Sequence, residues 1–236
     1  MERFGIFETV RVEKGKPVLI EYHYKRMAGS SRHLNIPFFL TLNEFKDRVV
    51  EAAGSGTTLV RFTLFRNGKT EIETRNCLKR ESVSLLPVYS VKRCFSALSR
   101  HKTVDIMNSL YAIEEAKRRG FDEALLFSNK GFVSETAFAN VFFYKKGILF
   151  TPSLKTGCLP GTRREFIKEV CSEMGVPVVE GFFEMKELLS ADEVFITSAR
   201  EDICPVRKIG PYPLKETTGK PFYRRLKTVI EEVVFG

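Results

Sequence analysis

The sequence predicts an α+β protein made of two parts, a small N-terminal α/β domain and a larger domain with a barrel-like or antiparallel sheet. Strand-like and helical segments follow one another in mixed order, without strict strand–helix alternation. A serine-rich connector, "CFSALSRHK", separates two such runs. The chain has 236 residues and 43% hydrophobic content, enough for one large or two small cores. The predicted domains are residues 1–93 and 102–236, joined by residues 94–101.

The N-terminal part reads as strands around two helices. Apolar alternation predicts a strand over 4–12, and residues 17–20 are expected to return as its hairpin partner. Helical spacing covers 21–34 and 41–54, with the second helix ended by Gly54. Strands over 57–65 and 70–75 flank an Asn-Gly pair, a strong hairpin signal, and the strand-like stretch 83–91 closes this part.

The C-terminal part begins with a helix over about 105–119, which Gly120 ends. Strands, two further helices and glycine-containing turns follow. The expected strands are 123–128, 141–145, 148–151 and 193–197, and the helices run from the "LPGTRR" segment to Gly175 and over 223–234. Glu135 is expected in a turn between strands, where the chain enters a buried strand.

The net charge of +9 allows two interpretations. Lysines and arginines could mark a nucleic-acid-binding face, but they are spread along the chain and interleaved with glutamates. A solvated surface that attracts small anions explains this pattern better than a nucleic-acid partner. A basic nucleic-acid-binding protein is retained as the non-enzyme alternative, and salt-dependent binding by colourless material would distinguish it.

The short apolar runs and the cysteine spacing argue against several other classes of protein. No run approaches the roughly 20 apolar residues of a membrane helix, and the N-terminus lacks an export signal, so we expect a cytoplasmic protein without a membrane partner. The five cysteines are odd in number, widely spaced and without a CxxC pair, which argues against disulfides and a metal site. They are expected to be reduced and mostly buried.

Lys102 and Glu135 are candidates for cofactor chemistry. Most lysines are surface charges, and a glutamate in a turn is normally solvated. A desolvated lysine can, however, form a Schiff base with an aldehyde cofactor. Pyridoxal phosphate (PLP) would also need an acid near its ring nitrogen and an anion site for its phosphate. Glu135 could supply the acid.

Two segments could supply the anion site. Gly161 and Thr162 precede or begin a predicted helix, whose free N–H groups and dipole favour an anion. The alternative is an ordinary helix start with Thr162 as the N-cap. Residues 196–202, "ITSARED", follow a strand and could offer a second set of amides.

The order of these motifs resembles fold-class IV PLP enzymes. That group contains branched-chain aminotransferases, D-amino-acid aminotransferases and 4-amino-4-deoxychorismate lyases. The matching segments, in family order, are "FGIFETVRV", "HYKRMAGSSRHL", "HKTVDIMNSL", "EEAKRRGFDEALLFSNKGFVSETAFANVFF", "GILFTPSLKTGCLPGTRREFI" and "ADEVFITSAREDICPV". They cover nearly the whole chain. The resemblance implies a D-amino-acid aminotransferase-like fold, PLP as the cofactor and a homodimer.

The resemblance also assigns roles to individual residues. Lys102 matches the lysine that forms the Schiff base, and Glu135 matches the acid on the pyridine nitrogen. Arg26 matches the arginine on the phosphate, and Asn140 matches a structural asparagine beside the cofactor strand. Gly161 with Thr162 and Ser198 with Ala199 match the two phosphate turns. Arg61 and Arg66 are candidates for the substrate carboxylate. The resemblance places Thr9 near the imine, where its hydroxyl could hydrogen-bond an oxygenated ring substrate.

Within the family, the residues favour the lyase. Branched-chain aminotransferases usually carry "FEG", "GNY" and "GEN" where this chain has "FET", "VDIM" and "FAN". Lyases commonly share the Thr9-x-Arg element, the Lys-Thr start at Lys102 and a small residue before Asn140. We therefore predict a lyase that forms 4-aminobenzoate and pyruvate from a small anionic amino substrate, in folate biosynthesis. A branched-chain or D-amino-acid aminotransferase is the alternative.

Overall fold

The computed structural model describes residues 4–215 and 219–235, and it divides them into two compact units. Unit 1 contains the described residues up to Lys79 together with His101–Ile106. Unit 2 contains Arg80–Arg100 and the described residues from Met107 onward. The predicted α+β class is confirmed, because antiparallel and parallel strand pairs occur together with helices in mixed order.

The division differs from the predicted boundaries at residues 93 and 102. Strand β5 (Val83–Arg93) pairs with strands of unit 2 and not with the N-terminal sheet. Lys102 lies in unit 1, since its carbonyl accepts a hydrogen bond of 2.8 Å from the N–H of Phe7. A strand belongs where its backbone finds partners, and local sequence patterns do not specify those partners.

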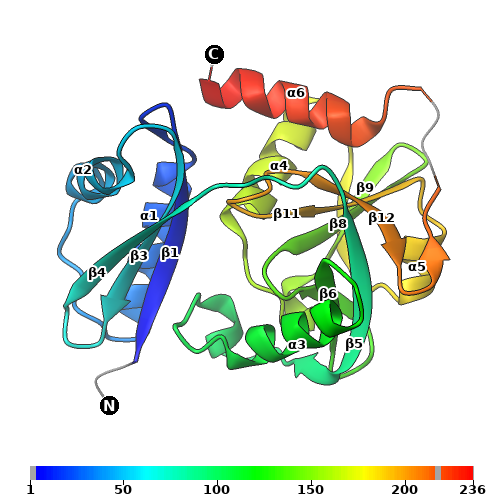
Figure 1. Ribbon diagram of the computed structural model, residues 1–236, viewed down its shortest axis with the longest axis horizontal. Coiled ribbons are helices and arrows are strands. Elements are labelled where there is room, and N and C mark those ends of the chain that lie inside the picture. The colour runs from blue at the N-terminus through cyan, green and yellow to red at the C-terminus, as the bar shows by residue number, and fades with distance from the viewer. Residues whose placement is uncertain (1–3, 216–218, 236) are drawn as a thin grey trace. The chain divides into compact units, whose positions relative to one another are not determined.

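Unit 1 is an antiparallel sheet with helices on one face (Figure 1). The strand order is β2 (Lys16–Pro17), β1 (Gly5–Glu13), β3 (Thr57–Phe65) and β4 (Thr70–Asn76), and the helices are α1 (Ile20–His33) and α2 (Leu42–Ala53). Ile6, Val10 and Val12 of β1 pack in the core formed with these helices. Since side chains alternate along a strand, Phe7 and Thr9 lie on the opposite face.

Most predicted elements of unit 1 are confirmed, and one has different bounds. The expected return strand over 17–20 does pair with β1, but it covers Lys16–Pro17, with a further bond of 2.8 Å from Val18 N–H to the carbonyl of Arg11, before Leu19 turns the chain into α1 with φ 54°. Helix α2 begins with a capping box between Thr41 and Glu44, which explains its clear sequence signal. The hairpin between β3 and β4 turns at Gly68, whose φ of 80° suits glycine.

Unit 2 is built on a mixed, curled sheet. Its strand order is β10 (Val178–Gly181), β9 (Ile148–Pro152), β8 (Asn140–Lys145), β11 (Glu193–Thr197), β12 (Cys204–Ile209), β5, β6 (Glu123–Ser128) and β7 (Val133–Thr136), with β13 (Tyr212–Pro213) beside β12. The core includes aromatic residues such as Phe127 and Phe143. The sequence missed β7, β10, β12 and β13. Each of the first three is short, and β13 has only two residues.

Helices cover parts of this sheet. Helix α3 (Met107–Arg118) packs against β5 and β6, and α4 (Thr162–Glu173) contacts β10. Helix α6 (Phe222–Phe235) lies beside α4 and contacts β11 (Figure 1). The remaining helical segments are α5 (Met185–Leu189), which the sequence missed, and short turns at Leu98–Arg100 and Leu154–Thr156.

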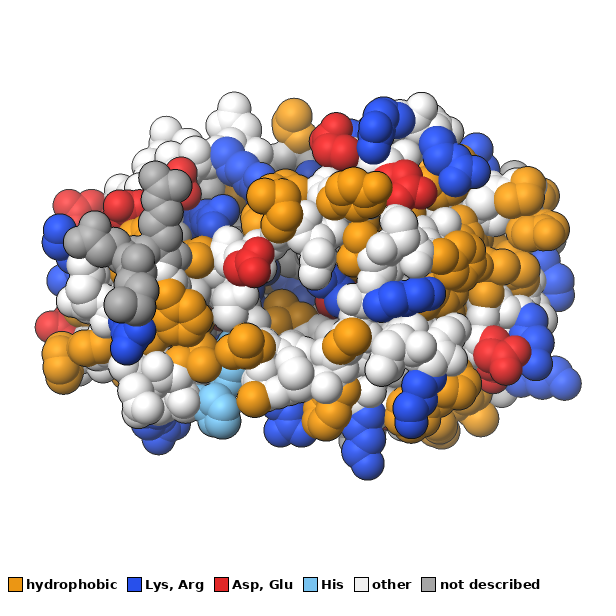
Figure 2. All heavy atoms as spheres, turned by 90° about the horizontal axis from the view of Figure 1, so that it is seen from below, with side chains coloured by type: hydrophobic (Ala, Val, Ile, Leu, Met, Phe, Trp, Pro, Cys, Tyr) orange, Lys and Arg blue, Asp and Glu red, His pale blue; other side chains and the backbone are white. Residues whose placement is uncertain are grey.

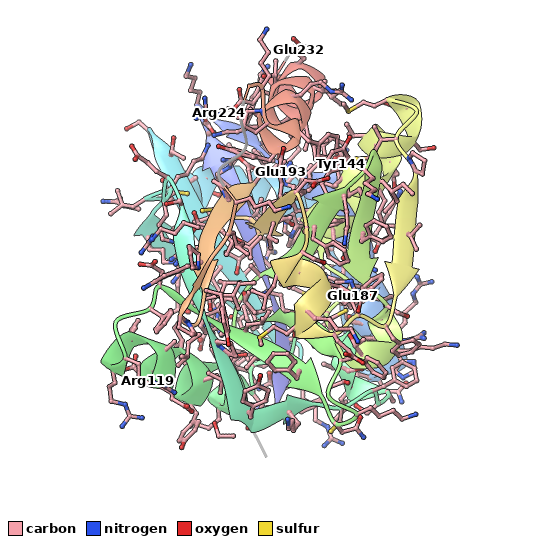
Figure 3. All side chains as sticks on the ribbon, turned by 90° about the vertical axis from the view of Figure 1, so that its right-hand side faces the viewer. Arg119, Tyr144, Glu187, Glu193, Arg224 and Glu232 are labelled. Carbon is pink, nitrogen blue, oxygen red and sulfur yellow. The ribbon has the colours of Figure 1, made fainter. Side chains whose placement is uncertain are left out.

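Helix α6 is anchored by two neighbouring strand residues. Glu193 of β11 accepts hydrogen bonds from the N–H groups of Phe222 (2.6 Å) and Tyr223 (2.9 Å). Its cross-strand neighbour Tyr144 stacks on the ring of Phe222, with centroids 4.1 Å apart. Figure 3 shows Glu193 and Tyr144 beside α6. The carboxylate therefore caps the N–H groups at the helix start, as anions do.

The surface charges and the cysteines can be compared with what the sequence predicted about nucleic-acid binding and disulfides. Figure 2 shows Lys and Arg side chains spread over one face among acidic, polar and apolar ones, and not gathered in one block. Cys158, Cys171 and Cys204 are buried thiols, and Cys94 is an exposed one. Burial raises the pKa of each of the three buried thiols to about 12, so they remain protonated. Among the described residues, no helix is long and apolar enough to cross a membrane.

Candidate active site

Lys102 lies on the edge of the unit 1 sheet. The segment 102–104 adds to β1: Thr103 forms an isolated bridge with Ile6, and Val104 N–H donates to the carbonyl of Gly5 at 3.0 Å. This pairing fixes the backbone of Lys102, whose Nζ lies 4.5 Å from the ring centroid of Phe7. An aromatic face attracts a cation and limits its hydration, so the amine is held beside the strand.

Arg26 of α1 is held by a buried acid. Glu8 is 1% exposed and accepts hydrogen bonds from Nε and Nη2 of Arg26, both at 2.7 Å. Two parallel bonds fix the plane of a guanidinium group. The Glu8 carboxylate also lies 2.6 Å from Nδ1 of His23. Arg26 is thereby oriented by the strand on which Phe7 and Thr9 lie.

The charge state of this cluster follows from burial and Arg26. Burial alone would raise the pKa of Glu8, but Arg26 and then His23 lower it to about 2. Burial lowers the pKa of His23, and Arg26 and Lys102 lower it further against the attraction of Glu8. His23 is therefore neutral at pH 7 and donates its Nδ1 proton, and Arg26 carries the charge that keeps Glu8 ionised.

The three predicted substrate residues lie at different places in unit 1. Thr9 of β1 pairs with Arg61 of β3 in the strand register. The guanidinium of Arg61 lies 4.0 Å from the ring centroid of Phe7, so Thr9, Arg61 and Lys102 share the neighbourhood of that ring. Arg66 is exposed in the β3–β4 turn, where its N–H donates to the carbonyl of Phe4.

In unit 2, Glu135 lies in strand β7 and not in a turn, which corrects the sequence-based expectation. Its Oε1 is 2.9 Å from Nε of Arg93, and its Oε2 accepts a hydrogen bond of 3.1 Å from the N–H of Leu159. A four-residue strand gives too little alternation to be recognised in sequence. Glu135 is 8% exposed, and its contacts with Arg93 and Leu159 orient the carboxyl oxygens as acceptors, the role that a ring N–H would need.

Asn140 positions the first predicted phosphate turn. Its Nδ2 donates to the carbonyl of Leu159 at 2.9 Å. A Cβ on Gly161 would lie 2.0 Å from Oδ1 of Asn140, so only glycine fits here. Gly161 is the N-cap of α4, and a glycine has no side chain with which to cap the helix. Thr162 is the first helical residue, so the alternative in which Thr162 is the N-cap is wrong.

The second predicted turn follows β11. Ser198 accepts hydrogen bonds at its carbonyl from Asp202 N–H (3.0 Å) and at Oγ from Glu201 N–H (3.2 Å). Ala199 is half-buried in the same turn. The preceding Thr197 pairs with Asn140 in the register of β11 and β8. Its Oγ1 is buried and has no hydrogen-bond partner among the described residues.

These features fit a bound phosphate group. The start of α4 supplies backbone N–H groups and a positive dipole end, and Gly161 at the N-cap places no side chain in front of that start. A buried hydroxyl without a partner is costly unless a ligand or water satisfies it. Unit 2 contains both predicted phosphate turns, Gly161 with Thr162 and Ser198 with Ala199, and also Glu135 and Asn140. Lys102 and Arg26 lie in the other unit, and the meeting of all these residues on one cofactor stays a prediction.

Several supporting residues were missed by sequence reasoning. They are Glu8, His23, Arg93, Arg163, Thr197 and Asp202. Glu8 had a usable signal, because alternation with Ile6 and Val10 places a charge on the buried face of β1, where it needs partners. The others depend on contacts between distant segments.

A lysine on a strand edge and a buried carboxylate beside a glycine-started helix are the parts that a PLP-dependent enzyme requires. The chain belongs to the amino-transferase class IV family, whose model matches residues 5–209. Members of this family depend on PLP, and the chain is accordingly a PLP-dependent enzyme. The predicted cofactor and enzyme class are thus confirmed.

Two curated relatives represent two activities of this family. The chain is 32% identical over 226 residues to the aminodeoxychorismate lyase of Bacillus subtilis (strain 168), covering 87% of this chain and 77% of the relative. It is 34% identical over 130 residues to the branched-chain-amino-acid aminotransferase of Escherichia coli (strain K12), covering 55% and 41%.

A solved structure supports the fold. The branched-chain aminotransferase of the thermophilic archaeon Thermoproteus uzoniensis, determined with norvaline, matches 98% of this chain and 85% of its own, with a TM-score of 0.87 and 24% identity. The predicted fold-class IV architecture is therefore confirmed, and the fold is shared with an aminotransferase.

Proposed function

We propose that this protein is a 4-amino-4-deoxychorismate lyase, which forms 4-aminobenzoate and pyruvate for folate biosynthesis in the cytoplasm. The observation that carries the proposal is the 32% identity to the Bacillus subtilis lyase over 87% of this chain. The elements Thr9-x-Arg11, Lys102-Thr103 and Ala139 before Asn140 support it, because they depart from the aminotransferase motifs in the same positions.

Lys102 would hold the cofactor and move the protons. Bound PLP supplies an electron sink for the bond-breaking step. Lys102 Nζ takes the proton from the substrate ring carbon that carries the amino group. As the C–O bond to the side chain breaks, a proton from the same amine reaches the departing three-carbon group. The products are pyruvate and an aromatic ring, 4-aminobenzoate, so the atoms balance without an oxidant or an acceptor.

Two carboxylates would set the charges around the cofactor. Glu135, held in place by Arg93 and the N–H of Leu159, would accept a hydrogen bond from the pyridine nitrogen and keep that nitrogen protonated. Glu8 orients Arg26, whose guanidinium would bind the phosphate together with the two backbone turns of unit 2. Glu135 thus acts on the ring, and Glu8 acts through Arg26.

Thr9 and Arg61 would recognise the substrate. They are register partners on the face of the sheet that also carries Phe7, beside which Lys102 lies. A hydroxyl and a guanidinium offer hydrogen bonds and positive charge to an oxygenated, anionic ring compound. A branched aliphatic side chain could use neither group. Arg66 is the second candidate for a substrate carboxylate.

An aminotransferase acting on branched-chain or D-amino acids is the second candidate. It is favoured by the 34% identity to the Escherichia coli enzyme over 130 residues. The fold fits both activities, since a branched-chain aminotransferase matches it with a TM-score of 0.87. The activities differ in where Lys102 delivers the proton: to the departing group in the lyase, or to the cofactor carbon in the aminotransferase.

Parallel assays separate the candidates. The purified holoenzyme is supplied either with 4-amino-4-deoxychorismate alone or with amino-acid and 2-oxo-acid pairs that include branched-chain and D-amino donors. We expect pyruvate and 4-aminobenzoate in equal amounts without any oxo acid. Rapid transamination with no 4-aminobenzoate would replace the lyase by the aminotransferase. Lys102→Ala should abolish either activity, and it serves as the control for contaminating enzymes.

A further inference from the structure

A buried ion pair joins the two predicted phosphate turns. Arg163 is the second residue of α4, directly after Thr162, and its guanidinium pairs with the carboxylate of Asp202. Asp202 lies in the loop between β11 and β12 that contains Ser198. Arg163 is 3% exposed and Asp202 4% exposed, so the pair is shielded from water and from salt.

Asp202 fixes its loop through both backbone and side chain. Its φ of 56° places it in the left-handed region, which aspartate adopts more readily than most residues. In this conformation its N–H donates to the carbonyl of Ser198. The side chain then reaches α4. Ser198, the predicted phosphate residue, is therefore tied to the first turn of α4 through one residue.

The start of α4 has a second attachment, which comes from Asn140. Asn140 of β8 bonds to the carbonyl of Leu159 and packs against Gly161, and in the sheet it is the register partner of Thr197. The first turn of α4 is thus held both by β8 and by the β11–β12 loop. The two sets of N–H groups have a fixed separation, as recognition of a tetrahedral anion requires.

Stability alone is a poor reason for this pair. Apolar residues of similar volume usually stabilise a core as well as a buried ion pair does, because both charges lose their hydration. The pair is also neutral overall, so it adds no net positive charge for a phosphate. What it does supply is a fixed geometry between two loops.

We propose that Arg163 and Asp202 are positioning residues, which align the backbone N–H groups of the two turns for the phosphate group of PLP. Neither residue touches the phosphate in this proposal. It rests on the predicted phosphate site, though not on whether the enzyme is a lyase or an aminotransferase. Loss of the pair should weaken recognition of the phosphate, and the rest of the cofactor should bind as before.

The test compares PLP with pyridoxal, which lacks the phosphate. The full-length chain is freed of cofactor with a carbonyl-capturing amine, and absorbance titrations give Kd for both compounds. In Asp202→Asn we expect the Kd for PLP to rise about tenfold, as when an outer-shell partner of a metal site is removed. The Kd for pyridoxal should change less than about twofold, a difference that a merely destabilised protein would not show.

A matched control uses another ion pair on the same helix. Arg164 pairs with Glu180 of β10 at 2.7 Å, one position along α4 but on the side of β10. Glu180→Gln removes the carboxylate of β10 that pairs with Arg164 and leaves both turns unchanged, so the ratio of the two Kd values should stay at the wild-type value. The double variant Arg163→Met/Asp202→Asn removes both charges and keeps at position 202 a residue that tolerates the left-handed conformation, so it should fold even where Asp202→Asn alone leaves Arg163 without its carboxylate.

Three outcomes distinguish a positioning role from packing. Loss of PLP selectivity in Asp202→Asn and in the double variant, with Glu180→Gln unchanged, supports the positioning role. Selectivity that survives in the folded double variant overturns it, since the pair would then serve packing alone. A wild-type chain that binds PLP and pyridoxal equally would overturn the predicted phosphate site as well, whichever reaction the enzyme catalyses.

Discussion

Glu8→Gln should weaken unit 1 by an amount that depends on pH. The folded-state pKa of Glu8 is about 2 against an ordinary value of 4.5. At about 1.4 kcal/mol for each pKa unit, the difference corresponds to about 3 kcal/mol of stability from the ionised form. Because the folded pKa is the lower one, this contribution is present above pH 4.5 and is lost as the pH falls toward 2. The variant should therefore lose about 3 kcal/mol at pH 7 and much less near pH 3.

Urea unfolding followed by far-UV circular dichroism measures this loss of stability, since the chain has no tryptophan for fluorescence. Glu73→Gln is the matched control in the same sheet. Glu73 of β4 is exposed and lies 3.8 Å from Arg61 Nε, so its loss should cost less than about 1 kcal/mol. An equal loss at pH 7 and pH 3 in Glu8→Gln would refute the reasoning, because the stabilisation would then not come from the ionised carboxylate.

Three further predictions concern a buried acid, the substrate and the assembly. Burial raises the pKa of Glu123 to about 7 despite Arg80, so its stability contribution is largest below pH 4.5 and is lost as the pH rises through 7. Measured by urea unfolding, Glu123→Gln should be more stable than the wild type by about 3 kcal/mol at pH 9 and by little at pH 4. Equal gains in stability at the two pH values would contradict this prediction. Thr9→Val should lower kcat/KM for 4-amino-4-deoxychorismate about fivefold, the value of one hydrogen bond. Thr58→Val, on the neighbouring strand, is the control. Unchanged kinetics in Thr9→Val would exclude a role of the Thr9 hydroxyl in substrate recognition. We also propose a homodimer, so sedimentation should give twice the 27.0 kDa chain mass, and a fully active monomer would contradict it.

Strong local signals predicted much of the fold. Strand β3 has the predicted bounds of residues 57 and 65, because its alternating apolar side chains fill the core of unit 1. Helix α2 was predictable from Thr41 and Gly54 at its ends. Strand β7 was not, since four residues carry too little pattern, and Glu135 was consequently expected in a turn.

The division of the chain depends on contacts that local patterns do not contain. Strand β5 reads like any other strand, and only its pairing with β6 and β12 assigns it to unit 2. Lys102 was recognised as a candidate by resemblance, but its attachment to β1 through Phe7 was not visible in the sequence. The pairing of Arg163 with Asp202 was missed for the same reason, because these residues are far apart in the chain and belong to different elements.

Attachment of PLP to Lys102 is the central requirement of the proposed chemistry, and borohydride reduction of the holoenzyme tests it most directly. Reduction makes the bond between the cofactor and its lysine permanent, and peptide mass spectrometry then identifies the modified residue. We expect the phosphopyridoxyl group on the peptide that contains Lys102, and none in Lys102→Ala. Labelling of a different lysine in the wild-type enzyme, or of none after loading with PLP, would contradict the assignment.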